Sequence, residues 1–413
     1  MTWRESLTPL RNGNFAWYYG SRFVNTLGNM MANIALAFAV LDITDSPTAL
    51  GQVLAAHTIP MVLFLLFGGV VADRFPRAVV LQLSNLTSAL TQGAIAFLVI
   101  TGTAELWMVI ALSAVHGLVS AISFPAMASM VPQLVPREQL QSANALLSLS
   151  RGGLTIIGPT VGALLVVTVG SGWALAVDAF TWLVAALLLT PVTMPPKPAP
   201  AERSSTLHEL REGWTLFRSI TWLWVIVLAF GFLNAIHTGA WFTLGPAVAK
   251  DTIGEQGWGF VLSAESIGLL AMTVLLLRVR MRRPLLYGML GCSLMGIPIF
   301  VLGVEPHLVT LIAVTFIAGA GIEMFSMGWN LAMQENIDDS MLSRAYSYDA
   351  LGSFVAMPVG QLLYGPLGEW FGFRDVLMWS GIAYAAIALL ALTSRSVRTL
   401  DRAPVPEKVT AEA

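Results

Sequence analysis

The chain has 413 residues, of which 56% are hydrophobic and only 11% are charged, and its mean hydropathy is +0.73. Soluble domains carry about 25% charged residues, so this composition excludes an ordinary soluble protein and predicts an integral membrane protein. The formal net charge of −2 gives no sign of a nucleic-acid partner, and the single cysteine, Cys292, excludes an internal disulfide and a cysteine metal cluster.

Twelve apolar segments are long enough to cross the roughly 30 Å hydrocarbon core of a bilayer as helices. Their apolar residues run continuously instead of alternating, which favours helices over the strands of a barrel. The first segment is too long for the apolar region of a cleaved signal peptide, so we expect it to be retained as a span. The expected spans are 15–41, 48–71, 78–101, 106–130, 142–169, 173–190, 222–249, 257–277, 284–304, 307–333, 344–368 and 374–393.

The positions of the basic residues predict the orientation of the spans. If the N-terminus is cytoplasmic, most of the 22 Lys and Arg residues fall on the cytoplasmic side, in agreement with the positive-inside rule. Arg also outnumbers Lys, which is typical of bacterial genomes of high GC content. We therefore expect a multi-pass protein of a bacterial plasma (inner) membrane, with both termini in the cytoplasm.

The longest polar interruption lies between the sixth and seventh expected spans, over 191–221, and begins with a proline-rich stretch that favours an extended spacer. An amphipathic helix on the inner membrane surface is expected to follow, with docking of a partner as the alternative. Its apolar face would carry Leu207, Leu210, Trp214 and Phe217. The expected organisation is a six-helix bundle over 1–190, a cytoplasmic linker over 191–221, a second six-helix bundle over 222–394 and a cytoplasmic tail over 395–413.

A short charged turn joins the second and third expected spans and contains Gly69, Asp73, Arg74 and Arg77. It resembles the loop between helices 2 and 3 of the major facilitator superfamily, a family of secondary transporters, although Pro76 stands where that family usually has glycine. Six spans on either side of a central linker extend the resemblance over nearly the whole chain. The resemblance implies an all-α membrane protein of twelve transmembrane helices in two six-helix pseudo-symmetric halves.

The same resemblance implies that the charged turn is a conformational switch. Asp73 would accept hydrogen bonds at the start of the eleventh span, near Arg344, where the helix dipole favours an anion. Asp349, about one turn further along, would join this network. Breaking the bridge would then change the populations of two open states. An ordinary solvated turn is the alternative interpretation.

Three stretches resemble the twelve-span drug:proton antiporter branch of that family, in particular its macrolide-efflux-like and siderophore-exporter-like members. They are 9–29 with 43–51, 124–146, and the pattern of Gly158, Pro159 and Gly162 in the fifth span. In that branch the last pattern is called the antiporter motif, and the resemblance implies that it seals the cavity against leak; close helix packing is the alternative. The chain departs from the branch at Ser113, where many members have a basic residue, and at Asn29, where an acidic residue is common.

Ionisable side chains inside the expected spans are costly and are therefore functional candidates. Glu323, near the middle of the tenth span, and Glu265, in the eighth, are the candidate proton-coupling carboxylates, because burial favours a neutral carboxyl and permits reversible protonation. Arg22 and Arg151 are candidate counter-charges from the other half. A static buried ion pair that holds the halves together is the alternative.

Three further polar residues in the spans are expected to be structural. Asp178, in the sixth span, is expected to make a hydrogen bond within the protein. His57 and His237 are expected to be packing histidines with satisfied rings, although each remains a possible proton carrier.

Methionine and aromatic side chains in the seventh and tenth spans predict an adaptable apolar wall, which suits bulky amphipathic compounds better than sugars. The candidate substrate-cavity residues are Asn234, Trp241, Phe242, Met324, Phe325, Met327 and Trp329. Core packing or contact with lipid is the alternative role for each of them.

These observations predict a proton-coupled secondary transporter that exports hydrophobic or amphipathic small molecules by alternating access, as in multidrug or antibiotic efflux. A dedicated exporter of a siderophore or another natural product is the alternative, and a non-transporting receptor or scaffold is a distant one. The chain has no P-loop, metal-binding pattern or nucleophile motif, so we expect no enzyme, cofactor or metal. The expected partners are a small-molecule substrate, protons and the lipid bilayer, and the chain is expected to be monomeric.

Overall fold

The computed structural model describes most of the chain. The described residues are 7–128, 130–136, 139–193, 214–215, 217–276, 279, 281–337 and 339–401; within these ranges the side chains at 65–74, 125, 128, 132, 141, 145, 339–344 and 347 are not described. Twelve helical segments of this part are long and apolar enough to cross a membrane. The prediction of an all-α membrane protein with twelve spans is confirmed.

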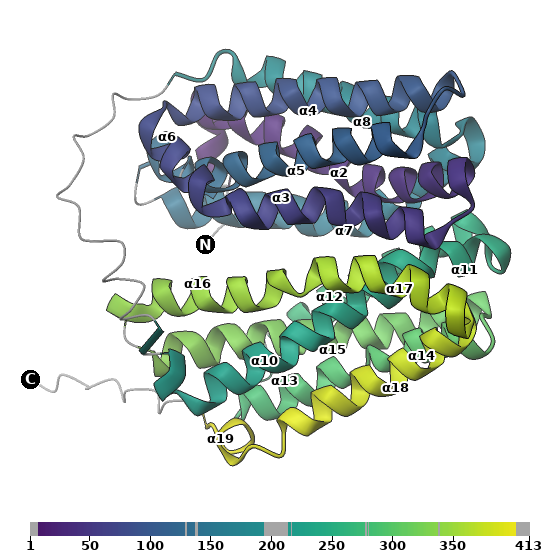
Figure 1. Cartoon of the computed structure of the whole chain (residues 1–413). Helices are drawn as coiled ribbons and strands as arrows, with labels where there is room; N and C mark the ends of the chain where they lie inside the picture. Colours follow the sequence, from purple (N-terminus) through teal and green to yellow (C-terminus); the bar gives the residue numbers. More distant parts are fainter. Residues whose placement is uncertain are drawn as a thin grey trace, which may run out of the picture.

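The helices form two layers, coloured purple to teal and teal to yellow in Figure 1. The first layer contains η1 (Thr8–Arg11), α2 (Gly13–Thr44), α3 (Pro47–Arg74), α4 (Arg77–Ile100), α5 (Leu106–Ala128), α6 (Val131–Leu134), α7 (Leu140–Val169) and α8 (Ser171–Leu189). The second contains α10 (Thr221–Ile236), η3 (His237–Leu244), α11 (Gly245–Asp251), α12 (Gly254–Leu276), α13 (Pro284–Ser293), α14 (Gly296–Val304), α15 (Leu308–Asn336), α16 (Asp339–Val355), α17 (Met357–Phe371), α18 (Phe373–Ala391) and α19 (Arg395–Arg398).

Three of the spans in the second layer are interrupted. The seventh is formed by α10, the π-helical turn η3 and α11, the ninth by α13 and α14, and the eleventh by α16 and α17. In η3, Gly239 lies against the ring of Tyr364 and the carbonyl of Gly360, both in α17. The π-helical turn, which is wider than an α-helical turn, therefore coincides with the close approach of α17. The break between α16 and α17 comes directly before Pro358, whose ring cannot continue the hydrogen-bond ladder.

Helix contacts follow the same pattern in both layers. In the first, α3 packs on α5 and α4 on α8; in the second, α12 packs on α15 and α14 on α18. The closest approaches also correspond, since Gly117 of α5 lies against the carbonyl of His57, and Gly319 of α15 lies against the carbonyl of Glu265. The helices in contact hold the same positions in the order of spans within each half. A duplicated six-helix unit produces such matching contacts.

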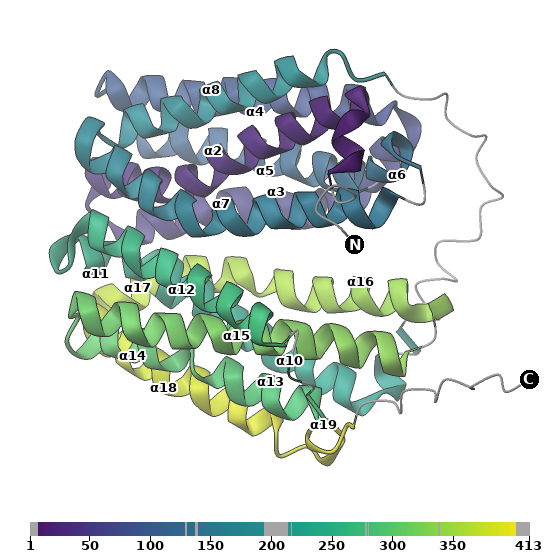
Figure 2. The ribbon, with the colours of Figure 1, turned by 180° about the vertical axis from the view of Figure 1, so that it is seen from behind.

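The two layers meet through α3 with α17 and α7 with α12. Thr48 Oγ1 donates to Glu369 Oε1 at 2.6 Å, and the hydroxyls of Thr160 and Ser263 are 2.7 Å apart. Gly51 lies against the backbone carbonyl of Gln361. We call this end of the molecule the closed end. Figure 2 shows the opposite end, which carries α6 and α19 and is called the termini end below.

The linker is described at its two ends, over 191–193 and over 214–215 and 217–221. Leu207 and Leu210 lie outside the described residues. Trp214 and Phe217 stack at 5.7 Å between ring centroids, and their rings lie 5.9 and 5.7 Å from that of Tyr348 in α16. The described part of the predicted apolar face therefore packs against the eleventh span.

Candidate functional site

A cavity of about 640 Å³ lies between the layers. Most of its lining comes from α2, α3 and α5 of the first layer, with a few residues from α4 and α8 and Arg151 from α7. The second layer contributes a smaller and mainly apolar wall, formed by Phe242, Pro246, Trp258, Leu262, Phe354 and Gln361. Because the main contacts between the layers are at the closed end, we infer that the cavity is entered from the termini end.

A polar stripe runs along the face of α2 that lines the cavity. Arg22, Asn25, Asn29 and Asn33 follow one another at intervals of three or four residues, so they share one face of the helix. Asn25 Oδ1 accepts hydrogen bonds from Arg22 Nη1 and Asn29 Nδ2, both at 3.4 Å. Asn25 Nδ2 is buried and has no hydrogen-bond partner among the described residues. The stripe therefore offers an amide donor that the described part of the protein does not use.

Among the described residues, the charged side chains of the cavity lining are those of two arginines. Arg22 lies on α2 and Arg151 on α7, and both line the same cavity. Neither makes an ion pair with a carboxylate among the described residues, and no Asp or Glu of the described part lines the cavity. The cavity consequently carries positive charge that nothing described in the protein neutralises.

Two histidines also face each other across α3 and α5. The rings of His57 and His116 are 5.4 Å apart, and the edge of His116 meets the ring of Trp182 at 5.5 Å. Ser120 Oγ is 3.5 Å from His57 Nε2, which fits the expected packing role of His57. His116 was not among the sequence candidates. Outside the cavity, His237 packs against the ring of Phe242 at 5.1 Å, but its Nε2 is buried without a hydrogen-bond partner among the described residues, so the expectation of a satisfied ring is not met.

The candidate carboxylates lie in the second layer, away from the cavity lining. Glu265 Oε2 accepts a hydrogen bond from Trp241 Nε1 at 3.2 Å, and Glu323 Oε1 accepts one from Thr273 Oγ1 at 2.9 Å. Both therefore sit at the contact of α12 with its neighbours, and neither is paired with Arg22 or Arg151. The expected charge pairing across the halves is absent from the described residues in this conformation.

Asp178 differs from its expected environment. It is fully buried in α8 against Gly28 of α2, and neither carboxyl oxygen has a hydrogen-bond partner of normal geometry among the described residues. The indole N–H of Trp182, four residues further along α8, interacts with this carboxyl group without meeting hydrogen-bond geometry, so the hydrogen bond expected for Asp178 is not formed in this conformation.

The pattern of Gly158, Pro159 and Gly162 lies where three helices meet. Gly158 and Gly162 of α7 lie against Met30 and the backbone of Met31 in α2. The carbonyl of Pro159 lies against Gly259 of α12 in the other layer. The pattern thus provides close helix packing, and this packing forms part of the contact between the halves.

Of the predicted substrate-cavity residues, only Phe242 is in the cavity lining. Trp241 is fully buried against Trp258, and Asn234 Nδ2 donates to the carbonyl of Ser353. Phe325 stacks with Trp329 and with Phe230 of α10, and Trp329 meets Trp222 of α10 edge to face. Met324 and Met327 are also outside the lining. Phe325 and Trp329 instead pack against α10, and Met324 lies against Gly291 of α13, because α15 turns these side chains into the second layer.

The sequence pattern of the Major Facilitator Superfamily matches residues 19–361. This chain belongs to the Major Facilitator Superfamily. Three proteins with similar sequences are exporters. Macrolide efflux protein A of Streptococcus pyogenes is 23% identical to this chain, over 94% of this chain's length and 97% of the length of that protein. The multidrug efflux pump Tap of Mycolicibacterium fortuitum is 23% identical over 92% and 95%. The enterobactin exporter EntS of Escherichia coli is 26% identical over 73% and 75%.

Solved structures support the same fold. The nucleoside transporter NupG aligns with a TM-score of 0.71 at 12% identity, over 92% of this chain and 98% of its own. A bacterial homologue of the lysosomal transporter Spinster, in an inward-facing conformation, aligns with a TM-score of 0.69 at 13% identity, over 98% and 100%. The chain is therefore a transporter of this superfamily and not an enzyme, and its efflux-type relatives agree with the predicted branch.

The predicted switch of the transporter is only partly described. The side chains of Gly69, Asp73, Arg74 and Arg344 lie outside the described part, so their expected contact stays a prediction. Arg77 begins α4. Asp349 Oδ2 accepts a hydrogen bond from Trp329 Nε1 at 3.0 Å, within the second half.

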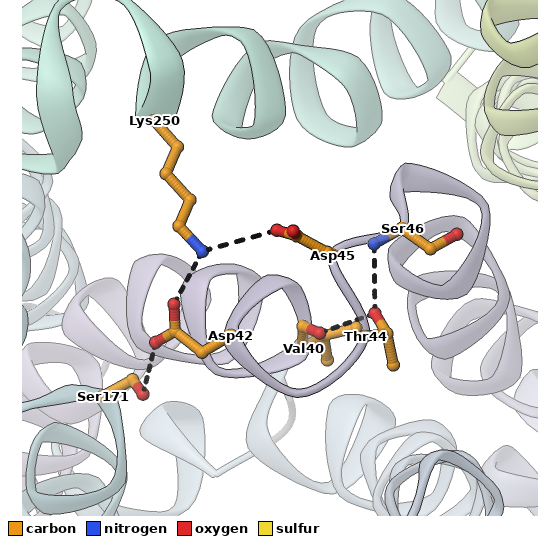
Figure 3. A network of polar contacts seen from close by, with 7 residues as sticks. All are labelled: Val40, Asp42, Thr44, Asp45, Ser46, Ser171 and Lys250. Atoms are coloured by element: carbon orange, nitrogen blue, oxygen red, sulfur yellow. Dashed lines mark hydrogen bonds and ion pairs between the residues drawn. The ribbon is translucent and has the colours of Figure 1, made fainter.

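An ion pair at the closed end was missed by the sequence analysis. Lys250 of α11 lies 2.8 Å from Asp42 and 4.0 Å from Asp45, and Ser171 donates to the second oxygen of Asp42 (Figure 3). The pair connects the two halves of the transporter across the ends of α2 and α11. Charge alone could have suggested it, since Lys250 is one of few basic residues expected on the side away from the termini.

Proposed function

We propose that this transporter exports amphipathic small molecules from a bacterial cell in exchange for protons, by alternating access. The observation that carries the proposal is a cavity of about 640 Å³ between two similar halves, which touch mainly at one end. This volume is typical of sites for drug-sized molecules. The exporters among its relatives make efflux the favoured direction of transport.

The proposal assigns the termini end to the cytoplasm, as the distribution of basic residues predicts. The conformation described here is then open to the cytoplasm and closed to the outside. Separation of α3 from α17 and of α7 from α12 would open the other end while the halves rock about the bound substrate.

Proton coupling is assigned to Glu265, with Glu323 as the second candidate. Glu265 is two residues from Ser263, whose hydroxyl meets Thr160 of α7 across the halves. Its partner Trp241 packs on Trp258 of the cavity wall, with ring centroids 4.7 Å apart. Gain or loss of a proton at Glu265 would therefore alter a side-chain network that reaches both the substrate cavity and the contact between the halves.

A dedicated exporter of one natural product is the second candidate. The polar stripe on α2 favours it, because several aligned hydrogen-bonding groups select a substrate by its acceptors, whereas an apolar wall accepts many compounds. The two candidates share the transport mechanism and differ in the breadth of the substrates accepted.

The experiment is substrate flux into proteoliposomes with an imposed pH gradient, for wild type, Glu265→Gln and Glu323→Gln. A panel of dyes, macrolides, tetracyclines and siderophores serves as substrate. The proposal expects gradient-driven flux of at least one compound, and loss of the gradient dependence in Glu265→Gln. Flux that ignores the gradient in the wild type would contradict proton coupling. Absence of flux for every compound would contradict broad efflux.

A further inference from the structure

The arginines of the cavity were expected to neutralise carboxylates of the other half, and the structure leaves them without that partner. Glu265 and Glu323 are hydrogen-bonded within the second layer, and no acidic side chain of the described part lines the cavity. Cations at membrane depth are costly unless they are paired or face a polar cavity. Arg22 and Arg151 face the cavity without a described carboxylate partner, so an anion that enters the cavity can balance their charge.

We propose that Arg22, Arg151 and the amides of α2 form the binding site for an anionic head group, and that the transported substrates are amphipathic organic anions. The inference rests on the proposed export function and specifies its substrate class. Carboxylate, sulfonate, phosphate and catecholate groups share the required chemistry, because each presents adjacent oxygens to the planar donors of a guanidinium.

The hydrogen bonds along α2 direct donors toward such a group. The side-chain oxygen of Asn25 is already used by Arg22 and Asn29, so its amide nitrogen remains as a donor. That nitrogen is buried, and the whole Asn25 residue is only 3% exposed. A buried donor without a partner is unfavourable, and an anion that accepts a hydrogen bond from it removes that cost.

The opposite wall suits the apolar part of the same molecule. Phe242, Leu262 and Phe354 line the cavity from the second half and carry no charge. A substrate with its anionic head against α2 and α7 and its apolar body against these residues would contact both halves at once. It would thereby link substrate binding to the relative position of the halves.

The test compares two dyes with the same xanthene ring system and opposite charge, fluorescein and rhodamine 6G. Fluorescence polarisation measures their binding to the purified full-length transporter in lipid nanodiscs, with no transport required. Fluorescein should bind at least about tenfold more tightly than rhodamine 6G. Arg22→Gln and Arg151→Gln should each weaken fluorescein binding about tenfold, as expected for loss of a charge-assisted hydrogen bond.

Matched variants separate charge in the cavity from general effects. Arg22→Lys and Arg151→Lys should retain part of the affinity, and Arg374→Gln, at an exposed position of α18 outside the cavity lining, should leave binding unchanged. Tighter or equal binding of rhodamine 6G, binding of neither dye by folded protein, or unchanged affinity in both Gln variants would overturn the proposal. Because binding is measured without a gradient, failure of proton-coupled export leaves this result interpretable.

Discussion

At the scale of single residues, the sequence located several side chains of the site but not their partners. Arg22 and Arg151 are recognisable because a charge inside an apolar span is rare, and both line the cavity. Their expected carboxylate partners lie elsewhere, because partners across spans depend on how the helices rotate and pack. The stripe of Arg22, Asn25, Asn29 and Asn33 was readable from its spacing, yet only Arg22 and Asn29 were singled out.

The ion pair of Lys250 with Asp42 allows a prediction of limited size. These side chains are 28% and 44% exposed, so water screens their attraction and the pair should contribute about 0.2–1 kcal/mol to closure of this end. A double-mutant cycle with Lys250→Gln and Asp42→Asn, read from the fraction of molecules closed at this end, should return a coupling in that range. The coupling should fall in high salt.

Two outcomes would contradict this estimate. A coupling of several kcal/mol would mean that the pair is shielded from water and acts as a strong latch. A coupling that is insensitive to salt would mean that the variants act through something other than charge, such as the hydrogen bond from Ser171 to Asp42.

At the scale of helices, the apolar lengths of the spans predicted their number and order, since a chain in lipid must pair its backbone groups internally. Their interruptions were harder to predict. The π turn of η3 accompanies the packing of Gly239 against Tyr364, a residue of another span. Pro358 was visible in the sequence, but a proline within a span only sometimes breaks it, so the separation of α16 from α17 was not predicted.

Contact between α3 and α17 depends on Gly51, which suggests a second prediction. A Cβ atom at this position would lie 1.9 Å from the backbone oxygen of Gln361, so Gly51→Ala must push the two helices apart. Overpacking of this kind costs about 1–3 kcal/mol. It should therefore increase the population in which α3 and α17 have separated, and the cavity opens at this end, by at least about fivefold. The measurement is alkylation of Phe242→Cys in the cavity by an impermeant maleimide added from outside.

The control is Gly152→Ala in α7, where an added Cβ would meet no atom within 4 Å. Cys292 is buried, so its background labelling should be small. Faster alkylation in Gly51→Ala but not in Gly152→Ala is the expected result. Equal rates in both variants would show that the α3–α17 contact does not limit access from that side.

At the scale of the whole molecule, two similar halves in contact at one end are arranged for alternating access. Equivalent helices pack together in each half. Across the interface, the packing of α7 against α12 corresponds to the packing of α3 against α17. This symmetry was foreseeable from six spans on either side of a linker. The end that is closed was not foreseeable, because the same sequence must be compatible with both states and only contacts in space distinguish them.

The most direct test of this account is a pair of distance measurements by electron paramagnetic resonance in a Cys292→Ala background. One pair of spin labels, at Thr103 and Glu305, spans the closed end; another, at Phe75 and Arg282, spans the termini end. The account predicts that pH and bound fluorescein change both distributions in opposite directions, one end opening as the other closes. Distances that remain fixed under all conditions, or that lengthen together, would contradict alternating access.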